Sequence, residues 1–244
     1  MSSEGPSSAL SVRRALVFAI TNQRGEIDEA TVHALVALRT EVDSITVVGG
    51  LGSEGVARAE QLADDVCSFG PPGGVSATAA WSAAAERLTG GEFDEVIFTG
   101  DHWLGPVGPF AALFDRMAQR DVALWSMTDR THDTEDSPAA SVPSPEWIVV
   151  RPDQLAWQTW EDLLSKHPAG TYLGEAIASL LRDHELTWAA AFPGVEYSST
   201  DPALFRAVAL MEGGCPIVCR RIFTSFPPFL DKHAVIGRDV WEAM

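Results

Sequence analysis

A carboxylate and an imidazole follow a strongly apolar run in the middle of the chain. The run Glu95-Val-Ile-Phe98 predicts a buried strand, and Asp101 and His102 come just after it. The carboxyl end of such a strand is where α/β enzymes hold a metal ion or a ribose, and His102 adds a nitrogen ligand. An aspartate at this place is also common as a turn or helix-capping residue, so position alone leaves both interpretations open.

A glycine-rich segment, Gly50-Leu-Gly52-Ser-Glu-Gly55, has the G-x-G-x-x-G spacing. In dinucleotide-binding folds this spacing cradles a pyrophosphate on backbone N–H groups. Here the segment follows the second predicted strand instead of the first, and no strand ending in an acid comes about twenty residues later. A tight turn that lets a helix pack closely is therefore the favoured interpretation.

Residues 128–145 are polar and acidic and contain three prolines. Such a segment is typical of a long mobile loop over a functional site. Its carboxylates and imidazole could bind Mg²⁺ or Mn²⁺, but a solvated run of charges is the favoured interpretation. The side chains concerned are Asp129, His132, Asp133, Glu135 and Asp136.

The C-terminal third contains one basic doublet, Arg220-Arg221, whose charge could meet a phosphate. A pair of surface side chains is the default interpretation.

Cys215 and Cys219 are four residues apart, but no His or Cys pair completes a zinc site around them. The odd count of three cysteines favours a reduced, cytoplasmic chain.

The elements that would position these residues alternate between strands and helices, which implies a parallel sheet wound with helices. Apolar runs predict strands at residues 15–20, 45–48, 95–98, 122–125, 147–150 and 188–192. Helical spacing predicts helices at residues 30–39, 56–65, 77–88, 109–119, 153–165 and 172–183. Because parallel strands end at one edge of a sheet, residues 22–25, 49–55, 101–103 and 128–145 are expected to converge.

Composition narrows the functional classes. The chain has 244 residues, of which 46% are hydrophobic, enough for one large domain with a sizeable core. We expect a disordered tail at residues 1–12 and a single domain at 13–244. The formal net charge of −17 disfavours nucleic acid and anionic membrane surfaces as partners. No run approaches the roughly 18 apolar residues of a transmembrane segment.

Several segments, taken in order, resemble the rhamnan synthesis protein F family of bacterial glycosyltransferases. The resemblance covers nearly the whole chain after residue 12, and no single motif in it is specific. The segments are Gly25-Glu-Ile-Asp28 after the opening strand, residues 45–50, 93–101 followed by Gly105-Pro106, 124–129, 147–150, 172–175, 214–216 and 230–238.

The resemblance implies an α/β fold with a single GT-A-like (Rossmann-like) domain, whose mostly parallel sheet is flanked by helices. It implies a hexosyltransferase that moves a sugar, by family name rhamnose, from a nucleotide-diphospho-sugar to a glycan or lipid-linked acceptor in surface polysaccharide assembly. A divalent metal, Mg²⁺ or Mn²⁺, is the implied cofactor. The implied location is cytoplasmic, including the inner face of the plasma membrane.

The resemblance also assigns roles to residues. Asp101 matches the strand-end acid that holds the donor and its metal, and His233 lies in a segment that can offer a metal or diphosphate ligand. Glu175 matches an acidic residue expected to act as the general base for the acceptor hydroxyl. The further residues expected to bind the donor are Asn22, Arg24, Gly49, Gly50, Arg220 and Arg221.

Two other classes of function remain open. The family pattern has polar residues that this chain replaces, with Asn22 for an acid, Gly100 for an amide and Pro145-Glu146 for a polar pair. These replacements favour a non-catalytic member that binds glycan or acts as a scaffold. A nucleotide-dependent oxidoreductase that uses residues 50–55 is the other alternative.

Overall fold

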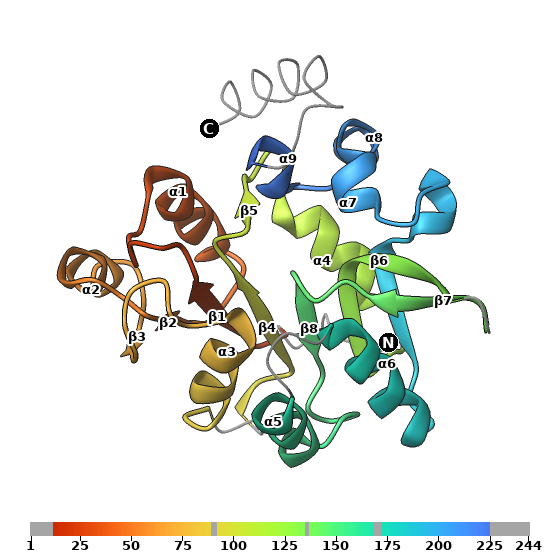
Figure 1. Cartoon of the computed structure of the whole chain (residues 1–244), viewed down its shortest axis with the longest axis horizontal. Coiled ribbons are helices and arrows are strands. Elements are labelled where there is room, and N and C mark those ends of the chain that lie inside the picture. Colours follow the sequence, from red (N-terminus) through yellow and green to blue (C-terminus); the bar gives the residue numbers. More distant parts are fainter. Residues whose placement is uncertain (1–11, 89–91, 135–136, 168–171, 225–244) are drawn as a thin grey trace, which may run out of the picture.

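A computed structural model describes residues 12–88, 92–134, 137–167 and 172–224 (Figure 1). The predicted tail lies outside these residues except for Val12. A central sheet has the strand order β3-β2-β1-β4-β8-β6-β7, with β9 beside β6. Helices cover both of its faces (Figure 1). The predicted α/β class with a mostly parallel, helix-flanked sheet is therefore confirmed.

One half of the sheet is wholly parallel. It contains β1 (Arg14–Ile20), β2 (Ser44–Gly49), β3 (Asp65–Ser68) and β4 (Glu95–Gly100). Successive side chains of β1 enter the cores on opposite faces of the sheet, which is why its sequence is a continuous apolar run. The chain winds from β1 toward β3 and then returns to β4 on the other side. The strand order therefore reverses between β1 and β4.

The other half is mixed. β8 (Ile148–Val150) lies antiparallel between β4 and β6 (Leu124–Thr134), so β6 runs in the same direction as β4. β9 (Trp188–Phe192) is parallel to β6, and β7 (Ser137–Pro143) is antiparallel to it. Six strands (β1, β2, β3, β4, β6 and β9) thus share one direction, and their carboxyl ends lie at one edge.

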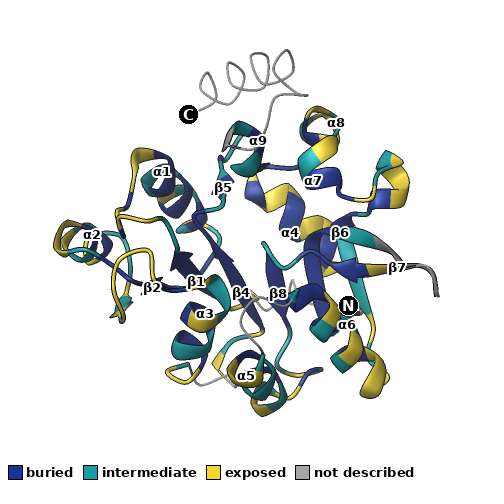
Figure 2. Cartoon of the chain, in the orientation of Figure 1, coloured by how far each residue is buried: buried dark blue, intermediate teal, exposed yellow. Residues whose placement is uncertain are grey.

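The helices form two layers whose inner sides are buried and whose outer sides are exposed (Figure 2). One layer contains α1 (Glu29–Leu38), α2 (Ser53–Ala59) and α4 (Phe110–Ala118). The other contains α3 (Ala77–Ala85), α5 (Trp157–Lys166) and α6 (Leu173–Asp183). None of the described helices is long and apolar enough to cross a membrane.

The last described part of the chain returns to the carboxyl edge of the sheet. After β9 come η2 (Gly194–Tyr197), α7 (Pro202–Phe205) and α8 (Ala207–Glu212). β10 (Val218–Cys219) then pairs antiparallel with β5 (Trp103–Leu104), just beyond β4, and leads into α9 (Arg221–Thr224). This short ribbon brings Arg220 beside His102, whose carbonyl accepts the Arg220 N–H at 2.8 Å.

Most predicted elements occur within a few residues of their expected bounds, but two expectations need correction and one element was missed. The helix predicted at 56–65 is α2, which ends at Ala59, and residues 65–68 form β3 instead. Residues 128–145 are not a structureless loop, since most of them belong to the β6–β7 hairpin. The β5–β10 ribbon was not predicted, because two-residue strands carry no periodic pattern.

Candidate functional site

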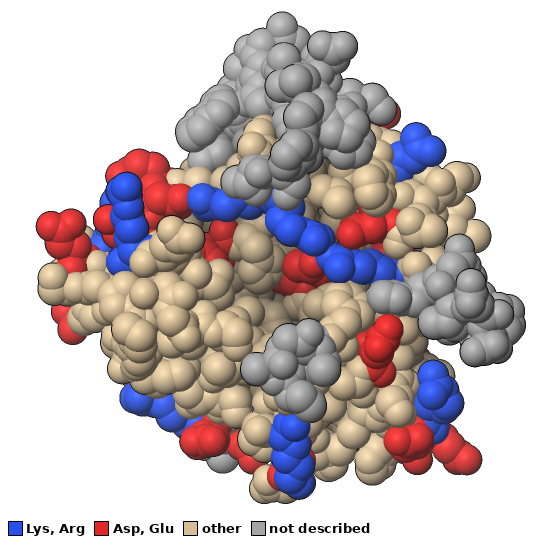
Figure 3. Space-filling view, viewed as in Figure 1, with Lys and Arg blue, Asp and Glu red and all other residues tan. Residues whose placement is uncertain are grey.

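A pocket of about 180 Å³ lies at the carboxyl ends of β1 and β4. Its lining residues are Thr21, Asn22, Asp101, His102, Arg220 and Arg221. In open α/β sheets ligands bind where the strand order reverses, and β1 and β4 are the two strands on either side of that reversal. In Figure 3, basic side chains form a band along a hollow in the middle of the face shown. This pocket is the candidate site.

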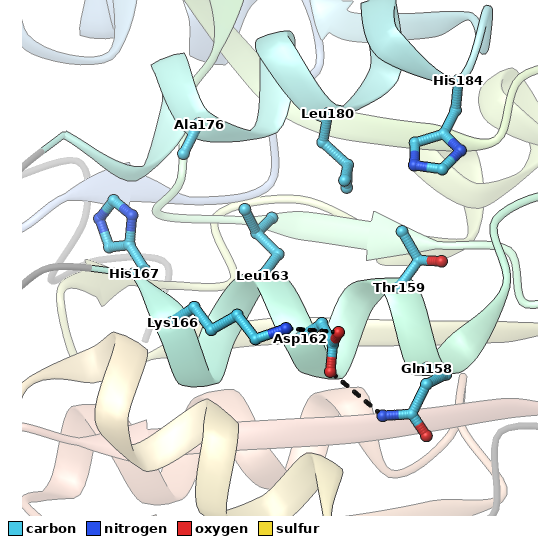
Figure 4. Close-up of a pocket in the computed structure, with 9 residues that line it drawn as sticks. All are labelled: Gln158, Thr159, Asp162, Leu163, Lys166, His167, Ala176, Leu180 and His184. Atoms are coloured by element: carbon cyan, nitrogen blue, oxygen red, sulfur yellow. Dashed lines mark hydrogen bonds and ion pairs between the residues drawn. The ribbon is translucent and has the colours of Figure 1, made fainter.

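A larger groove lies between α5 and α6 (Figure 4). It measures about 530 Å³, and it is bordered by the outer sides of both helices, including Leu163 and Leu180. The interactions drawn within it, from Lys166 and Gln158 to Asp162, all stay on α5. Its lining residues belong to α5, α6 and the residues just after them, and none of them follows the carboxyl end of a strand, so its size alone does not make it a better candidate.

Asp101 is buried at the base of the pocket, with 5% of its surface exposed. Its carboxylate accepts four hydrogen bonds: from the backbone N–H of Thr21 at 3.1 Å and of Asn22 at 2.9 Å, from Thr21 Oγ1 at 2.7 Å and from Asn22 Nδ2 at 2.9 Å. A carboxylate offers about four acceptor positions. Three of the donors share Oδ2 and Thr21 Oγ1 bonds Oδ1, so Asp101 fastens the turn after β1 to the end of β4 with both of its oxygens.

Asn22 organises the same turn with both ends of its amide. Nδ2 also donates to the carbonyl of Glu26 at 2.7 Å, and Oδ1 accepts from the backbone N–H groups of Arg24 and Glu26. An acid at position 22, as in the family pattern, would place a second carboxylate against Asp101. The amide thus fits this chain, because it donates to Asp101 where a carboxylate would repel it.

Arg220 and Arg221 are the cationic side chains of the pocket. Arg220 Nη1 lies 2.6 Å from Oδ2 of Asp28, the residue that caps α1. Arg221 Nη2 lies 3.1 Å from Glu146 Oε1 and 3.6 Å from Asp201 Oδ2. The structure therefore brings together four of the predicted donor-binding residues: Asn22, Asp101, Arg220 and Arg221.

Glu146 connects the pocket to the second half of the sheet. Its main-chain carbonyl accepts hydrogen bonds from Thr99 Oγ1 at 3.0 Å, His102 Nε2 at 2.6 Å and Trp103 Nε1 at 2.8 Å. Its carboxylate binds Arg130, Arg221 and Ser144. Burial raises the pKa of Glu146, but the nearby positive charges and the Ser144 hydrogen bond outweigh it, so the pKa is lowered. The Glu146 carboxylate is therefore ionised and binds Arg221, while the main-chain carbonyl of the same residue binds His102.

Arg130 completes this ionic cluster from β6. Its Nε lies 3.2 Å from Asp201 Oδ2, and its guanidinium carbon lies 5.1 Å from the centre of the Tyr172 ring. Burial raises the pKa of Asp201, although the arginine charges oppose this rise. Sequence reasoning missed Arg130, Glu146 and Asp201 as a group, because residues so far apart in sequence carry no shared spacing.

Two other predicted site residues, Arg24 and Glu175, do not line the pocket. Arg24 is exposed in the turn after β1, and its Nη1 lies 3.8 Å from Glu26 Oε2. Glu175 is exposed in the first turn of α6, three residues after Tyr172. His233 lies outside the described residues.

The glycine-rich segment serves backbone packing. A Cβ on Gly50 would lie 2.2 Å from the Pro71 carbonyl oxygen, and one on Gly55 would lie 2.1 Å from the Gly25 carbonyl oxygen. Gly49 ends β2, the strand next to β1, and Gly50 follows it; neither lines the pocket. The geometry therefore agrees with a tight turn that lets α2 pack closely, as the sequence favoured.

A divalent cation does not fit the described residues. Among the described parts of the chain, no three His, Cys, Asp or Glu side chains are grouped so that they could hold an ion. Both oxygens of Asp101 already accept from N–H or O–H donors. Burial raises the pKa of Cys215 to about 12 and also raises that of Cys219, so these thiols are poor ligands.

No protein-family model matches the sequence, and no curated protein matches it significantly. Solved structures with a similar fold include 4-diphosphocytidyl-2C-methyl-D-erythritol synthase from Anaerococcus prevotii, with TM-score 0.48 and 11% identity over 75% of this chain and 89% of that one. Glucosyl-3-phosphoglycerate synthase from Mycobacterium tuberculosis, solved with Mn²⁺, UDP and its product, has TM-score 0.45 and 15% identity over 84% of this chain and 80% of that one. At these values the similarities do not say what this chain binds or does.

Proposed function

We propose that this chain transfers a sugar from a nucleotide-diphospho-sugar to a glycan or lipid-linked acceptor in surface polysaccharide assembly. The observation that carries the proposal is the pocket at the reversal of strand order, where two arginines face the carboxyl ends of β1 and β4. Guanidinium groups match the geometry and charge of phosphate oxygens. The resemblance to the rhamnan synthesis family supports the reaction class and suggests rhamnose as the sugar.

In this proposal the diphosphate leaves the sugar as negative charge builds on its oxygens. Arg220 and Arg221 stabilise that charge, and the Asn22 turn, fixed by Asp101, shapes the opposite wall of the pocket. No step is assigned to a metal, because the described residues do not fit one. The proposed roles of Asp101 and His233 as metal ligands therefore have no support in the described part of the chain.

We propose that Glu175 accepts the proton of the attacking acceptor hydroxyl, which gives inversion at the sugar by a single displacement. Its support is its place in the first turn of α6. The Glu175 N–H donates to the Tyr172 carbonyl at 3.3 Å, and the Tyr172 ring lies beside Arg130 of the ionic cluster. Glu175→Gln should lower kcat about 10²–10⁴-fold with little change in donor affinity. Single-turnover transfer assays measure this. Glu161→Gln, on α5, is the matched control.

A non-catalytic member remains a second candidate, and one observation favours it. Asp28, Glu146 and Asp201 already engage the two pocket arginines. An oxidoreductase that uses residues 50–55 is disfavoured, because the glycines of that segment pack against neighbouring backbone. A cytoplasmic reaction with the acceptor at the inner face of the plasma membrane is part of the proposal.

A panel of UDP-, GDP- and dTDP-sugars tests the proposed function. A ligand that binds the folded chain raises its melting temperature by mass action, so one nucleotide series should stand out in thermal-shift assays. The stabilising donor should then release its nucleotide in the presence of an acceptor extract. Stabilisation without turnover would favour the non-catalytic candidate, and stabilisation by NAD(P) alone would overturn the proposal.

A further inference from the structure

We infer that the pocket holds a diphosphate through the guanidinium groups of Arg220 and Arg221 in place of a divalent cation, and that Asp28 competes with the ligand for Arg220. The identity of the ligand as a donor diphosphate rests on the function proposed above. The competition for Arg220 rests on the contacts alone.

The first step of the argument is the state of the strand-end acid. Asp101 is the carboxylate best placed to hold a cation at the pocket, yet two backbone amides, an amide side chain and a hydroxyl already donate to it. Rotating the carboxylate toward a cation would leave these buried donors without an acceptor. Three of the donors share Oδ2, whereas Thr21 Oγ1 donates to Oδ1, so a cation on Oδ2 would displace the donors that hold the turn after β1, and a cation on Oδ1 would compete with the Thr21 hydroxyl.

The second step is the placement of the cationic side chains. Arg220 and Arg221 lie at the start of α9, fixed to the end of β4 by the β5–β10 ribbon. Their side chains are 30% and 40% exposed, whereas Glu146 and Asp201 behind Arg221 are 15% and 13% exposed. Glu146 and Asp201 orient Arg221, and the cation is the more accessible partner in that group. Asp28, at 47%, is more exposed than Arg220, so an anion entering the pocket meets the Arg221 guanidinium first and meets Arg220 together with Asp28.

The third step concerns Asp28, which does two things at once. Oδ1 accepts the Thr31 N–H at 2.8 Å and caps α1, and it also lies 3.4 Å from Arg220 Nη2, while Oδ2 lies 2.6 Å from Arg220 Nη1. Only the contacts with Arg220 need a negative charge. A phosphate oxygen bound to Arg220 would take the place of Oδ2. The Asp28–Arg220 pair is thus an internal competitor for an anionic ligand.

Asp28→Asn separates the two roles, because asparagine caps helices about as well as aspartate but carries no charge. Exposed ion pairs of this kind contribute little, so releasing Arg220 should strengthen anion binding about two- to fivefold. A misfolded variant would bind the anion more weakly, so stronger binding cannot result from misfolding. Asp65→Asn is the matched control, since Asp65 pairs with Arg87 at 3.1 Å outside the pocket and its change alters the net charge equally.

The experiment is titration calorimetry of the full chain with inorganic pyrophosphate and with UDP, in EDTA and in Mg²⁺. We expect both to bind in EDTA. Arg220→Ala and Arg221→Ala should each weaken binding at least about tenfold, as loss of a charge-assisted hydrogen bond predicts. Arg87→Ala should leave binding unchanged, and Asp28→Asn but not Asp65→Asn should strengthen it.

The outcomes separate this inference from the proposed function. Binding only in Mg²⁺, or an Asp28→Asn variant that binds no better than Asp65→Asn, overturns the inference and leaves a metal-dependent transferase possible. Binding of pyrophosphate in EDTA with the expected variant pattern, but of no nucleotide or nucleotide-sugar, supports the arginine site and overturns the proposed donor. Absence of binding by either probe in EDTA overturns the inference.

Discussion

At the scale of single residues, Asp101 lies where the sequence predicts it but fastens a turn of the chain, whereas the expected role was to hold a ligand. Asp101 was predicted from its position after a strand, and that position is correct. Its carboxylate, however, is turned toward the chain's own turn after β1. An acidic side chain at the end of a strand can hold a ligand or fasten a turn, and the hydrogen-bond donors around it decide between these two roles. Those donors, Thr21 and Asn22, lie about eighty residues earlier in the sequence.

Removal of the Asp101 carboxylate tests this positioning role. Alanine is the substitution that tests it, because an asparagine oxygen could replace Oδ2, to which the three N–H donors bond, while its amide nitrogen donates to Thr21 Oγ1. Asp101→Ala leaves the Thr21 and Asn22 donors without their acceptor, so the free energy of unfolding should fall by about 1–3 kcal/mol. Urea denaturation measures this fall. A variant with unchanged stability and lost pyrophosphate binding would show that Asp101 contacts the ligand and not the turn.

Glu146 gives a second prediction at this scale. Glu146→Gln leaves Arg130 and Arg221 with reduced compensation in a buried cluster, so it should lower stability by about 3–5 kcal/mol and, because it removes a negative charge that competes for Arg221, strengthen anion binding. Glu95→Gln is the control. Glu95 forms a buried cluster with Arg14 and Arg151 at the opposite end of β4, so its loss should destabilise the chain without changing binding.

The same residue makes stability depend on pH. The pKa of Glu146 is lowered from an ordinary 4.5 in the folded state, since the charges of Arg130 and Arg221 outweigh the effect of burial. Below pH 4.5 the unfolded chain therefore binds more protons, and stability falls as the pH drops. Asp201, with its raised pKa, acts in the opposite sense. Urea midpoints measured from pH 6 to pH 3 should thus fall less steeply in Glu146→Gln than in the parent; equal slopes would contradict this assignment.

At the scale of elements, the sequence predicts what periodicity reveals and misses what long-range pairing creates. The run at 15–20 and the Asp28 cap specify β1 and the start of α1 without any tertiary information. The β6–β7 hairpin lacks an alternating apolar pattern, so it was interpreted as a loop. Its inner end is held by Asp129, whose buried carboxylate accepts from Ser141 and from the Gly194 N–H.

The glycine-rich turn yields a prediction about elements. Gly55→Ala would force a Cβ against the Gly25 carbonyl, where the ideal position is 2.1 Å from the oxygen. Overpacking of this kind typically destabilises by about 1–3 kcal/mol. Thermal unfolding with and without UDP should show a lower melting temperature and an unchanged UDP-induced shift. A selective loss of the shift would mean that the turn contacts the nucleotide.

At the scale of the whole molecule, the fold class followed from composition and alternation, while the site depends on the path of the chain. Two helical layers and a sheet that reverses its order between β1 and β4 bring residues 22, 101 and 220 to one edge. With a net charge of −17, the molecule as a whole repels a dianion. Binding of a diphosphate therefore depends on the local positive charge that Arg220 and Arg221 place at the pocket.

The structure of the chain determined with a bound nucleotide-sugar tests the central claim most directly. The account predicts diphosphate oxygens within hydrogen-bond distance of Arg220 and Arg221, with the Asp28–Arg220 contact broken and the Asp101 hydrogen bonds intact. A nucleotide-sugar seated between α5 and α6, or a diphosphate held by a cation on Asp101 with both arginines still on their carboxylates, would contradict it.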